Sequence, residues 1–182
     1  VIRVDPDAGG LDYARAAGVP FLIVDRKAYA SKLEFEIALD DALHVAGVDL
    51  VCLAGFMRLL SAEFVNAWRD RMLNIHPSLL PSFPGLDPHG QALRAGVKIS
   101  GATVHFVIPE TDAGPIVMQG AVPVGNDDTA ETLAARVLSV EHQIYPQALR
   151  LLATDGIKIE GDVTTNTAGV CSDDNLIAPT VI

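Results

Sequence analysis

The sequence predicts an α/β protein with a doubly wound, mostly parallel sheet and an antiparallel extension toward the C-terminus. In the first half, short apolar runs of strand length alternate with longer amphipathic segments, which is typical of parallel strands covered by helices on both faces. In the second half, closely spaced strands follow one another without a crossover helix, which favours antiparallel pairing. The 182 residues suit one ordinary domain.

The first half of the chain supplies the alternation. Four short apolar runs predict strands, at residues 1–4, 21–24, 50–53 and 72–76. Helices are expected between them, at residues 7–17, 31–46 and 61–68. The helix from Ser31 is the best marked, because Ser31 and Glu34 have the spacing of a capping box.

The second half predicts a different arrangement. A helix around residues 90–95 leads to a strand at 102–107, and one extended strand that can bend at Gly120 is expected over 116–124. A long helix from Asp128 to about Leu152 closes a domain that covers residues 1–160. The segment 161–182 is polar and without periodicity, so we expect a flexible tail.

Composition excludes several classes of protein. The net charge of −10 argues against a nucleic-acid surface, which needs clustered lysine and arginine. No apolar run approaches the length of a membrane span, and no signal peptide is expected at the N-terminus. Cys52 and Cys171 have neither metal-binding nor redox spacing, which favours a reducing, cytoplasmic setting. Cys52, within an apolar run, is expected to be a small buried residue.

The run Asn74-Ile75-His76-Pro77-Ser78 lies where an apolar strand meets a proline-rich loop. Because side chains alternate along a strand, Asn74 and His76 should project from the same face. An amide donor and an imidazole at a rigid strand end can polarise a carbonyl and stabilise the oxyanion that forms when it is attacked. A solitary histidine at a strand end is otherwise more often structural.

Asp112 is the candidate carboxylate for this pair. It lies in a loop that Pro109, Gly114 and Pro115 should hold in a defined shape. A carboxylate beside His76 would stabilise the charged imidazole and make it a cation or proton donor. The alternative is a simple turn or capping aspartate, which is common before Gly-Pro.

Several separate motifs, in order from Val1 to about Leu152, resemble glycinamide ribonucleotide formyltransferases. They are Ala54–Leu60, Asn74–Pro81, Phe83–Leu86, Gly101–Phe106, Thr132–Val137, Glu141-His142 and Tyr145-Pro146. The resemblance implies a Rossmann-like formyltransferase fold. It also implies transfer of a formyl group from 10-formyltetrahydrofolate, as cosubstrate, to the amino group of N1-(5-phosphoribosyl)glycinamide in purine (IMP) synthesis, with no metal.

The resemblance also implies roles for individual residues. Asn74 and His76 match the catalytic pair, and Asp112 matches the aspartate that keeps the histidine charged. One loop matches the segment that binds the folate; its residues are Met57, Arg58, Leu59 and Leu60. Arg58 is also suited to the folate tail. Lys32 falls where an arginine holds that tail, and Glu141 matches a carboxylate that binds the ribose hydroxyls. Without the family, Met57 would more often be a core residue, Arg58 a surface residue, Glu141 a solvated one and His105 a structural or supporting one.

Two other reactions and one binding function are the alternatives to this transferase activity. A formyltetrahydrofolate hydrolase shares fold and triad, but Pro77 and Leu79 favour the transferase. A methionyl-tRNA formyltransferase would need a basic appendage that the chain lacks. An inactive folate-binding remnant is the alternative from a different class. Small-molecule substrates are the expected partners, without nucleic acid or membrane, and the chain is expected to be a monomer or homodimer.

The chain departs from the family pattern in two places. The usual first strand, Gly-rich phosphate loop and first helix have no counterpart, and Arg3-Val4 replaces a Ser-Asn pair; a truncated copy of a longer protein is the expected explanation. Asp87-Pro88-His89-Gly90 stands where a His-Thr-His-Arg-like stretch is common. The sequence predicts no consequence for this second departure.

Overall fold

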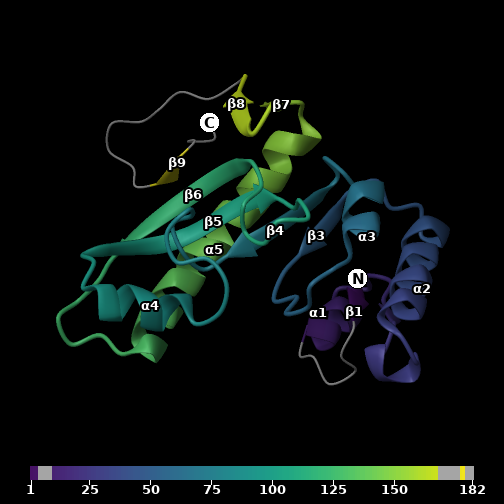
Figure 1. Ribbon diagram of the computed structural model, residues 1–182, viewed down its shortest axis with the longest axis horizontal. Helices are drawn as coiled ribbons and strands as arrows, with labels where there is room; N and C mark the ends of the chain where they lie inside the picture. Colours follow the sequence, from purple (N-terminus) through teal and green to yellow (C-terminus); the bar gives the residue numbers. More distant parts are fainter. Residues whose placement is uncertain (4–9, 168–176, 179–182) are drawn as a thin grey trace. The chain divides into compact units, whose positions relative to one another are not determined.

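The strands form a parallel pair near the N-terminus and a larger mixed sheet later in the chain (Figure 1). The structure is a computed structural model that describes residues 1–3, 10–167 and 177–178. The chain divides into two units, Val1–Asp49 and Leu50–Ile182, and each is described by itself. Parallel pairs with intervening helices, followed by antiparallel strands, confirm the α/β fold expected from the sequence. The single domain over residues 1–160 stays a prediction.

Within residues 1–3 and 10–49, the first unit contains one parallel strand pair and two α-helices. β1 (Ile2–Arg3) pairs with β2 (Leu22–Ile23), and α1 (Gly10–Ala16) lies between them in the chain. A short 3₁₀ turn, η1 (Arg26–Ala28), precedes α2 (Lys32–Val45). Part of the helix expected at residues 7–17 and part of the strand expected at 1–4 fall outside the described residues.

The start of α2 confirms the predicted cap with one change. The Ser31 hydroxyl accepts a hydrogen bond from the Glu34 backbone N–H at 3.1 Å, as an N-cap should. The Glu34 carboxylate reaches one residue further back than in a capping box and accepts from the Ala30 N–H at 3.0 Å. Two backbone donors at the helix start are therefore satisfied.

The second unit is built on a five-stranded sheet in the order β3–β4–β5–β6–β9. Its strands are β3 (Val51–Leu53), β4 (Met72–His76), β5 (Ile99–Phe106), β6 (Ile116–Pro123) and β9 (Ile177–Ala178). β3 and β4 are parallel, and every later pair in the sheet is antiparallel. The expected antiparallel extension therefore begins at β5, and β6 is continuous through Gly120.

Three α-helices accompany this sheet: α3 (Ala62–Ala67), α4 (Pro88–Ala95) and α5 (Ala130–Ala153). α5 runs along the sheet (Figure 1) and buries one face against β5 and β6. Residues such as Val104, Met118, Leu133 and Ile144 are fully or almost fully buried between them. None of the helices in the described ranges is both long and apolar enough to cross a bilayer.

Tyr145 joins α5 to the two parallel strands. Its hydroxyl donates toward the backbone carbonyls of Leu53 at 2.8 Å and Leu73 at 3.3 Å. Burial is the main cause that raises the pKa of this hydroxyl, so it remains a donor. Because residues four apart share a helix face, Tyr145 also fixes the direction in which Glu141 projects.

The start of α5 carries a reciprocal cap that can be tested. The Thr129 hydroxyl accepts from the Thr132 N–H, and the Thr132 hydroxyl accepts from the Thr129 N–H. Thr129→Ala removes the hydroxyl that accepts from the Thr132 N–H and should lower the free energy of unfolding by about 1 kcal/mol, measured by urea denaturation. Ser139→Ala, which removes a hydroxyl within the same helix, is the matched control; equal losses in both variants would contradict a capping role.

One expectation from the sequence proves wrong. Cys52 is exposed, because β3 is an edge strand within the described part of the second unit. The flexible tail expected at residues 161–182 stays a prediction, although β8 (Val163–Asn166) pairs with β7 (Ile157–Glu160) and β9 pairs with β6. The threonines of β8 alternate between exposed and half-buried positions, and a pattern made of threonine gives no apolar signal.

Candidate active site

The candidate site begins at the end of β4, where the register with β5 decides which side chains meet. Asn74 lies opposite His105, and His76 lies opposite Thr103. Directly opposed residues of antiparallel strands have adjacent side chains. The Asn74 Nδ2 atom accordingly lies 3.2 Å from His105 Nε2.

His105 fixes the orientation of the Asn74 amide. Its Nδ1 lies 2.9 Å from the Phe106 carbonyl, which can only accept, so Nδ1 carries the proton. Burial lowers the pKa of His105, with the Phe106 hydrogen bond and the Asp112 charge acting in the opposite direction. A neutral ring leaves Nε2 as an acceptor for one Asn74 N–H. The second N–H of that amide remains available as a donor.

His76 is held between two acceptors. Its Nε2 lies 3.0 Å from the Phe83 backbone carbonyl, and its Nδ1 lies 3.4 Å from Asp112 Oδ2. The ring is buried, with 6% of its surface exposed. Because a carbonyl and a carboxylate both accept, the doubly protonated imidazole is the form that satisfies both sides.

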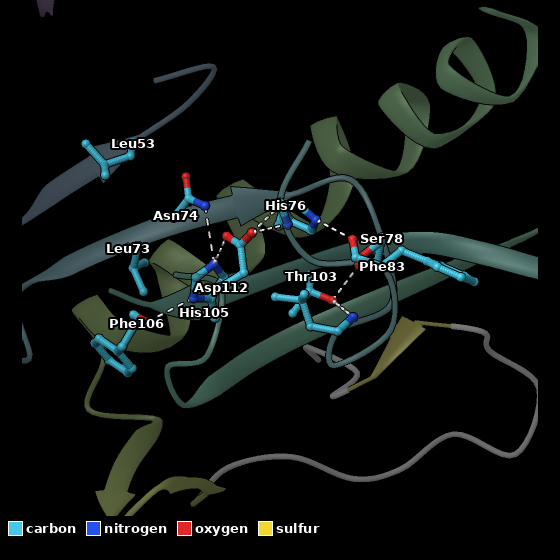
Figure 2. A network of polar contacts seen from close by, with 12 residues as sticks. Leu53, Leu73, Asn74, His76, Ser78, Phe83, Thr103, His105, Phe106 and Asp112 are labelled. Carbon is cyan, nitrogen blue, oxygen red and sulfur yellow. Dashed lines mark hydrogen bonds and ion pairs between the residues drawn. The ribbon is translucent and has the colours of Figure 1, made fainter. Parts of the chain in front are cut away.

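Asp112 connects His76 to a neighbouring loop (Figure 2). Its Oδ2 also accepts from the Gly85 backbone N–H at 2.8 Å, and its Oδ1 lies 3.9 Å from His105 Nε2. Its side chain is only 11% exposed. The structure therefore brings the predicted Asn74, His76 and Asp112 together, and Asp112 does more than cap a turn. Their catalytic role stays a prediction.

The loop that carries Asp112 depends on a glycine. Asp112 has a positive φ of 53°, and so does Phe83, at 57°. A Cβ atom on Gly114 would lie 1.9 Å from the Phe106 carbonyl oxygen, so only glycine fits there. Residues in uncommon backbone conformations cluster at functional sites when the surrounding structure holds them. Here both of them contact His76.

One pocket in the second unit, of about 580 Å³, is lined by Asn74, His76, His105 and Asp112. This volume suits a small-molecule ligand. Residues 55–60, 85–88 and 107–112 line it together with Asn74, His76, His105 and Glu141. Met57 and Leu59 are 85% and 72% exposed on its rim, so they are not core residues. Arg58 is exposed on the same segment. Lys32 lies in the first unit, 3.7 Å from Glu36, and its folate role stays a prediction.

Sequence comparison adds the family to this geometry. The family described as formyl transferase matches residues 1–149, most of the chain. The chain belongs to the formyl transferase family. This finding confirms the family resemblance noted in the sequence.

Members of the formyl transferase family resemble the chain over most of its length. The trifunctional purine biosynthetic protein adenosine-3 of Bos taurus is 51% identical over 159 residues, which are 87% of this chain and 16% of that protein. The chain thus spans about a sixth of that relative. The phosphoribosylglycinamide formyltransferase of Bacillus subtilis is 42% identical, covering 81% of this chain and 75% of its own.

Solved structures of the family also resemble the chain. Glycinamide ribonucleotide transformylase 1 from Symbiobacterium toebii is 52% identical with a TM-score of 0.88, over 91% of this chain and 78% of its own. A formyltetrahydrofolate deformylase from Pseudomonas syringae is more distant, at 29% identity and a TM-score of 0.83, over 91% of this chain and 55% of its own.

The departure from the family pattern at residues 87–90 has a structural basis. Asp87 is the N-cap of α4, with a positive φ of 55°, and its carboxylate accepts from the Gly90 N–H at 3.2 Å. A Cβ atom on Gly90 would lie 2.3 Å from that carboxylate. Arg94 pairs with the same carboxylate at 3.0 Å. A side chain at position 90 would therefore displace the Asp87 carboxylate from its capping position.

Glu141 provides a test that combines stability with binding. Burial raises the pKa of its carboxyl, while the charges of His142 and His76 act in the opposite direction. A raised pKa means that folding disfavours the charged form, so stability is lost as pH rises from below 4.5 through the folded-state pKa. Glu141→Gln should therefore raise the melting temperature at pH 7 and change it little at pH 4, measured by calorimetry.

Under the ribose-binding role that the family resemblance implies for Glu141, the same Glu141→Gln variant should bind the ribonucleotide less well, because an amide accepts hydrogen bonds from hydroxyls more weakly than a carboxylate. An increase in KM for the ribonucleotide of about tenfold is expected, with kcat nearly unchanged. Glu131→Gln on the same helix is the control, because the Thr129 hydroxyl and a backbone N–H lower the pKa of Glu131. A melting temperature that rises in both variants would contradict the burial argument.

Proposed function

We propose that the chain transfers the formyl group of 10-formyltetrahydrofolate to the amino group of N1-(5-phosphoribosyl)glycinamide, a step of purine synthesis. The observation that carries this proposal is the arrangement of His76, held between a carboxylate and a carbonyl, next to an oriented Asn74 amide in a ligand-sized pocket. The family and its named relatives support the same reaction.

The proposed chemistry is direct attack of the amine on the formyl carbon. As the new C–N bond forms, the carbonyl electron pair moves to the formyl oxygen, and the free Asn74 N–H and the His76 cation stabilise the resulting oxyanion. Collapse of this intermediate breaks the bond to the folate nitrogen. The attacking amine loses one proton, and the departing nitrogen gains one. Asp112 keeps His76 charged and assists this transfer through water.

The proposed binding places the two substrates on different sides of the pocket. The segment from Met57 to Leu60 binds the folate, with Arg58 attracting the carboxylates of its tail. A folate role for Lys32 stays a prediction. Glu141 accepts hydrogen bonds from the ribose hydroxyls. The reaction needs no metal, and we place it in the reducing cytoplasm that the cysteine usage favours.

The assay compares formyl release in the full-length protein with and without the ribonucleotide. Transfer predicts loss of formyl from 10-formyltetrahydrofolate only when the amine is present, together with a formylated product. Release that does not depend on the amine would instead identify a hydrolase. Folate binding without turnover would identify a binding protein. The lower identity to the deformylase, 29% against 52%, favours the first outcome.

A further inference from the structure

We propose that Thr103 and Gln119 are positioning residues for His76. Neither lines the pocket, but together they clamp the loop of residues 77–85, whose Phe83 carbonyl accepts the Nε2 proton of His76. The catalytic part of this inference rests on the proposed function. The hydrogen bond from Thr103 to Ser78, one contact of the clamp, is drawn in Figure 2.

Thr103 is the centre of the clamp. Its hydroxyl donates to the Ser78 carbonyl at 2.7 Å and accepts from the Leu80 N–H at 3.0 Å and from Gln119 Nε2 at 2.9 Å. A hydroxyl has one donor and two acceptor sites, so all of its capacity is used. The side chain is completely buried. A fully satisfied buried network of this kind holds its members in one arrangement.

Gln119 closes the clamp from the next strand, β6. Its Nε2 group donates to the Leu80 carbonyl at 2.9 Å as well as to the Thr103 hydroxyl. Both amide hydrogens are therefore committed. Leu80 is held through its N–H by one clamp residue and through its carbonyl by the other. The register places Thr103 opposite both His76 on β4 and Gln119 on β6, so the clamp lies beside the residue it positions.

The restraint continues along the loop to both groups that contact His76. The Ser78 hydroxyl donates to the Ser82 carbonyl at 2.6 Å, which fixes the peptide that leads into Phe83. Two residues further on, the Gly85 N–H holds Asp112. The clamp thus acts on both sides of the imidazole, through the Phe83 carbonyl and through the Asp112 carboxylate.

Burial alone does not hold this part of the loop. Pro81, Ser82, Pro84 and Gly85 are exposed, and Phe83 is half-buried. The anchored residues are Ser78 and Leu80, which are buried and bonded to the sheet. Hydrogen bonds from Thr103 and Gln119 therefore fix the start of the exposed stretch that leads to Phe83. The Phe83 side chain, which packs against the core, and a hydrogen bond from Gln91 Nε2 to the Pro84 carbonyl at 3.2 Å add to this restraint.

The test uses Thr103→Val, which keeps the shape but removes the hydroxyl, Thr103→Ser, which restores it, and Gln119→Met, which removes both amide donors. We expect kcat to fall about 10- to 100-fold in Thr103→Val and Gln119→Met, with KM for the folate changed less than threefold. Thr103→Ser should retain most of the activity. Thr154→Val, which removes a bonded hydroxyl at the end of α5, is the matched control and should retain full activity.

A second readout does not depend on turnover. In ¹⁵N-histidine-labelled protein, the His76 Nε2–H bonded to Phe83 should exchange slowly with water and give an imidazole N–H signal. The signal should be lost in Thr103→Val and Gln119→Met and kept in Thr103→Ser, in samples whose circular dichroism shows them to be folded. Retention of the signal and of kcat within twofold in folded Gln119→Met would overturn the proposal. If the protein lacks formyl transfer altogether, the N–H signal still tests the clamp.

Discussion

His76→Ala is expected to lower kcat for formyl transfer by a factor on the order of 10²–10³, the usual effect of losing one group that stabilises an oxyanion. Asp112 and the Phe83 carbonyl hold the imidazole in place. Alanine removes the cation and leaves the Phe83 carbonyl without its partner. Steady-state kinetics at saturating folate and ribonucleotide measures the loss.

Substrate binding should be affected much less than turnover in His76→Ala. Because the interaction strengthens as the oxyanion develops, the change is expected in kcat and not in KM. His44→Ala, an exposed histidine on α2, serves as the control for loss of a histidine ring. Turnover within a few-fold of the unchanged protein would remove His76 from the mechanism.

Asp112→Asn is expected to lower kcat by about 10²-fold while keeping the size of the side chain. Because Asp112 Oδ2 faces both the Gly85 N–H and His76 Nδ1, an amide whose NH₂ group takes this position donates to His76 Nδ1 and gives up the Gly85 bond. A neutral imidazole with its proton on Nε2 would then satisfy both the amide and the Phe83 carbonyl. The substitution therefore removes the charge on His76 without requiring the ring to move.

Nitrogen-15 spectra of the histidine rings separate this explanation from a general loss of structure. Because the two acceptors are both satisfied only by two N–H groups, His76 should give the pattern of a doubly protonated ring in the unchanged protein and of a neutral Nε2–H tautomer in Asp112→Asn. Asp127→Asn, on an exposed turn, is the matched control for loss of an acidic charge. A charged His76 ring combined with low activity in Asp112→Asn would show that the carboxylate acts in some other way.

The fold was largely predictable because its signals are local. The cap at Ser31, the alternation along residues 72–76 and the continuous strand through Gly120 each appear in a few neighbouring residues. What the sequence did not reveal has two causes. β8 lacks an apolar pattern, and the exposure of Cys52 depends on which strands pair with β3.

The sequence predicted side chains of the site, but not the strand register or the backbone groups that hold them. Alternation placed Asn74 and His76 together, whereas the assignment of Asp112 came from a family resemblance. Register could not be inferred, so the contact between His105 and Asn74 was not foreseen and His105 was assigned only a structural or supporting role. The Phe83 carbonyl and the Gly85 N–H are backbone groups, which every residue possesses and which leave no mark in a sequence.

The cap of α4 has a consequence for exchanging segments between members of the family. The Asp87 carboxylate occupies the space that any side chain at position 90 would need. Grafting one of these two residues from a relative without the other would either displace the capping carboxylate or leave the helix end beside the pocket uncapped. Chimeras and variant libraries should therefore exchange positions 87 and 90 together.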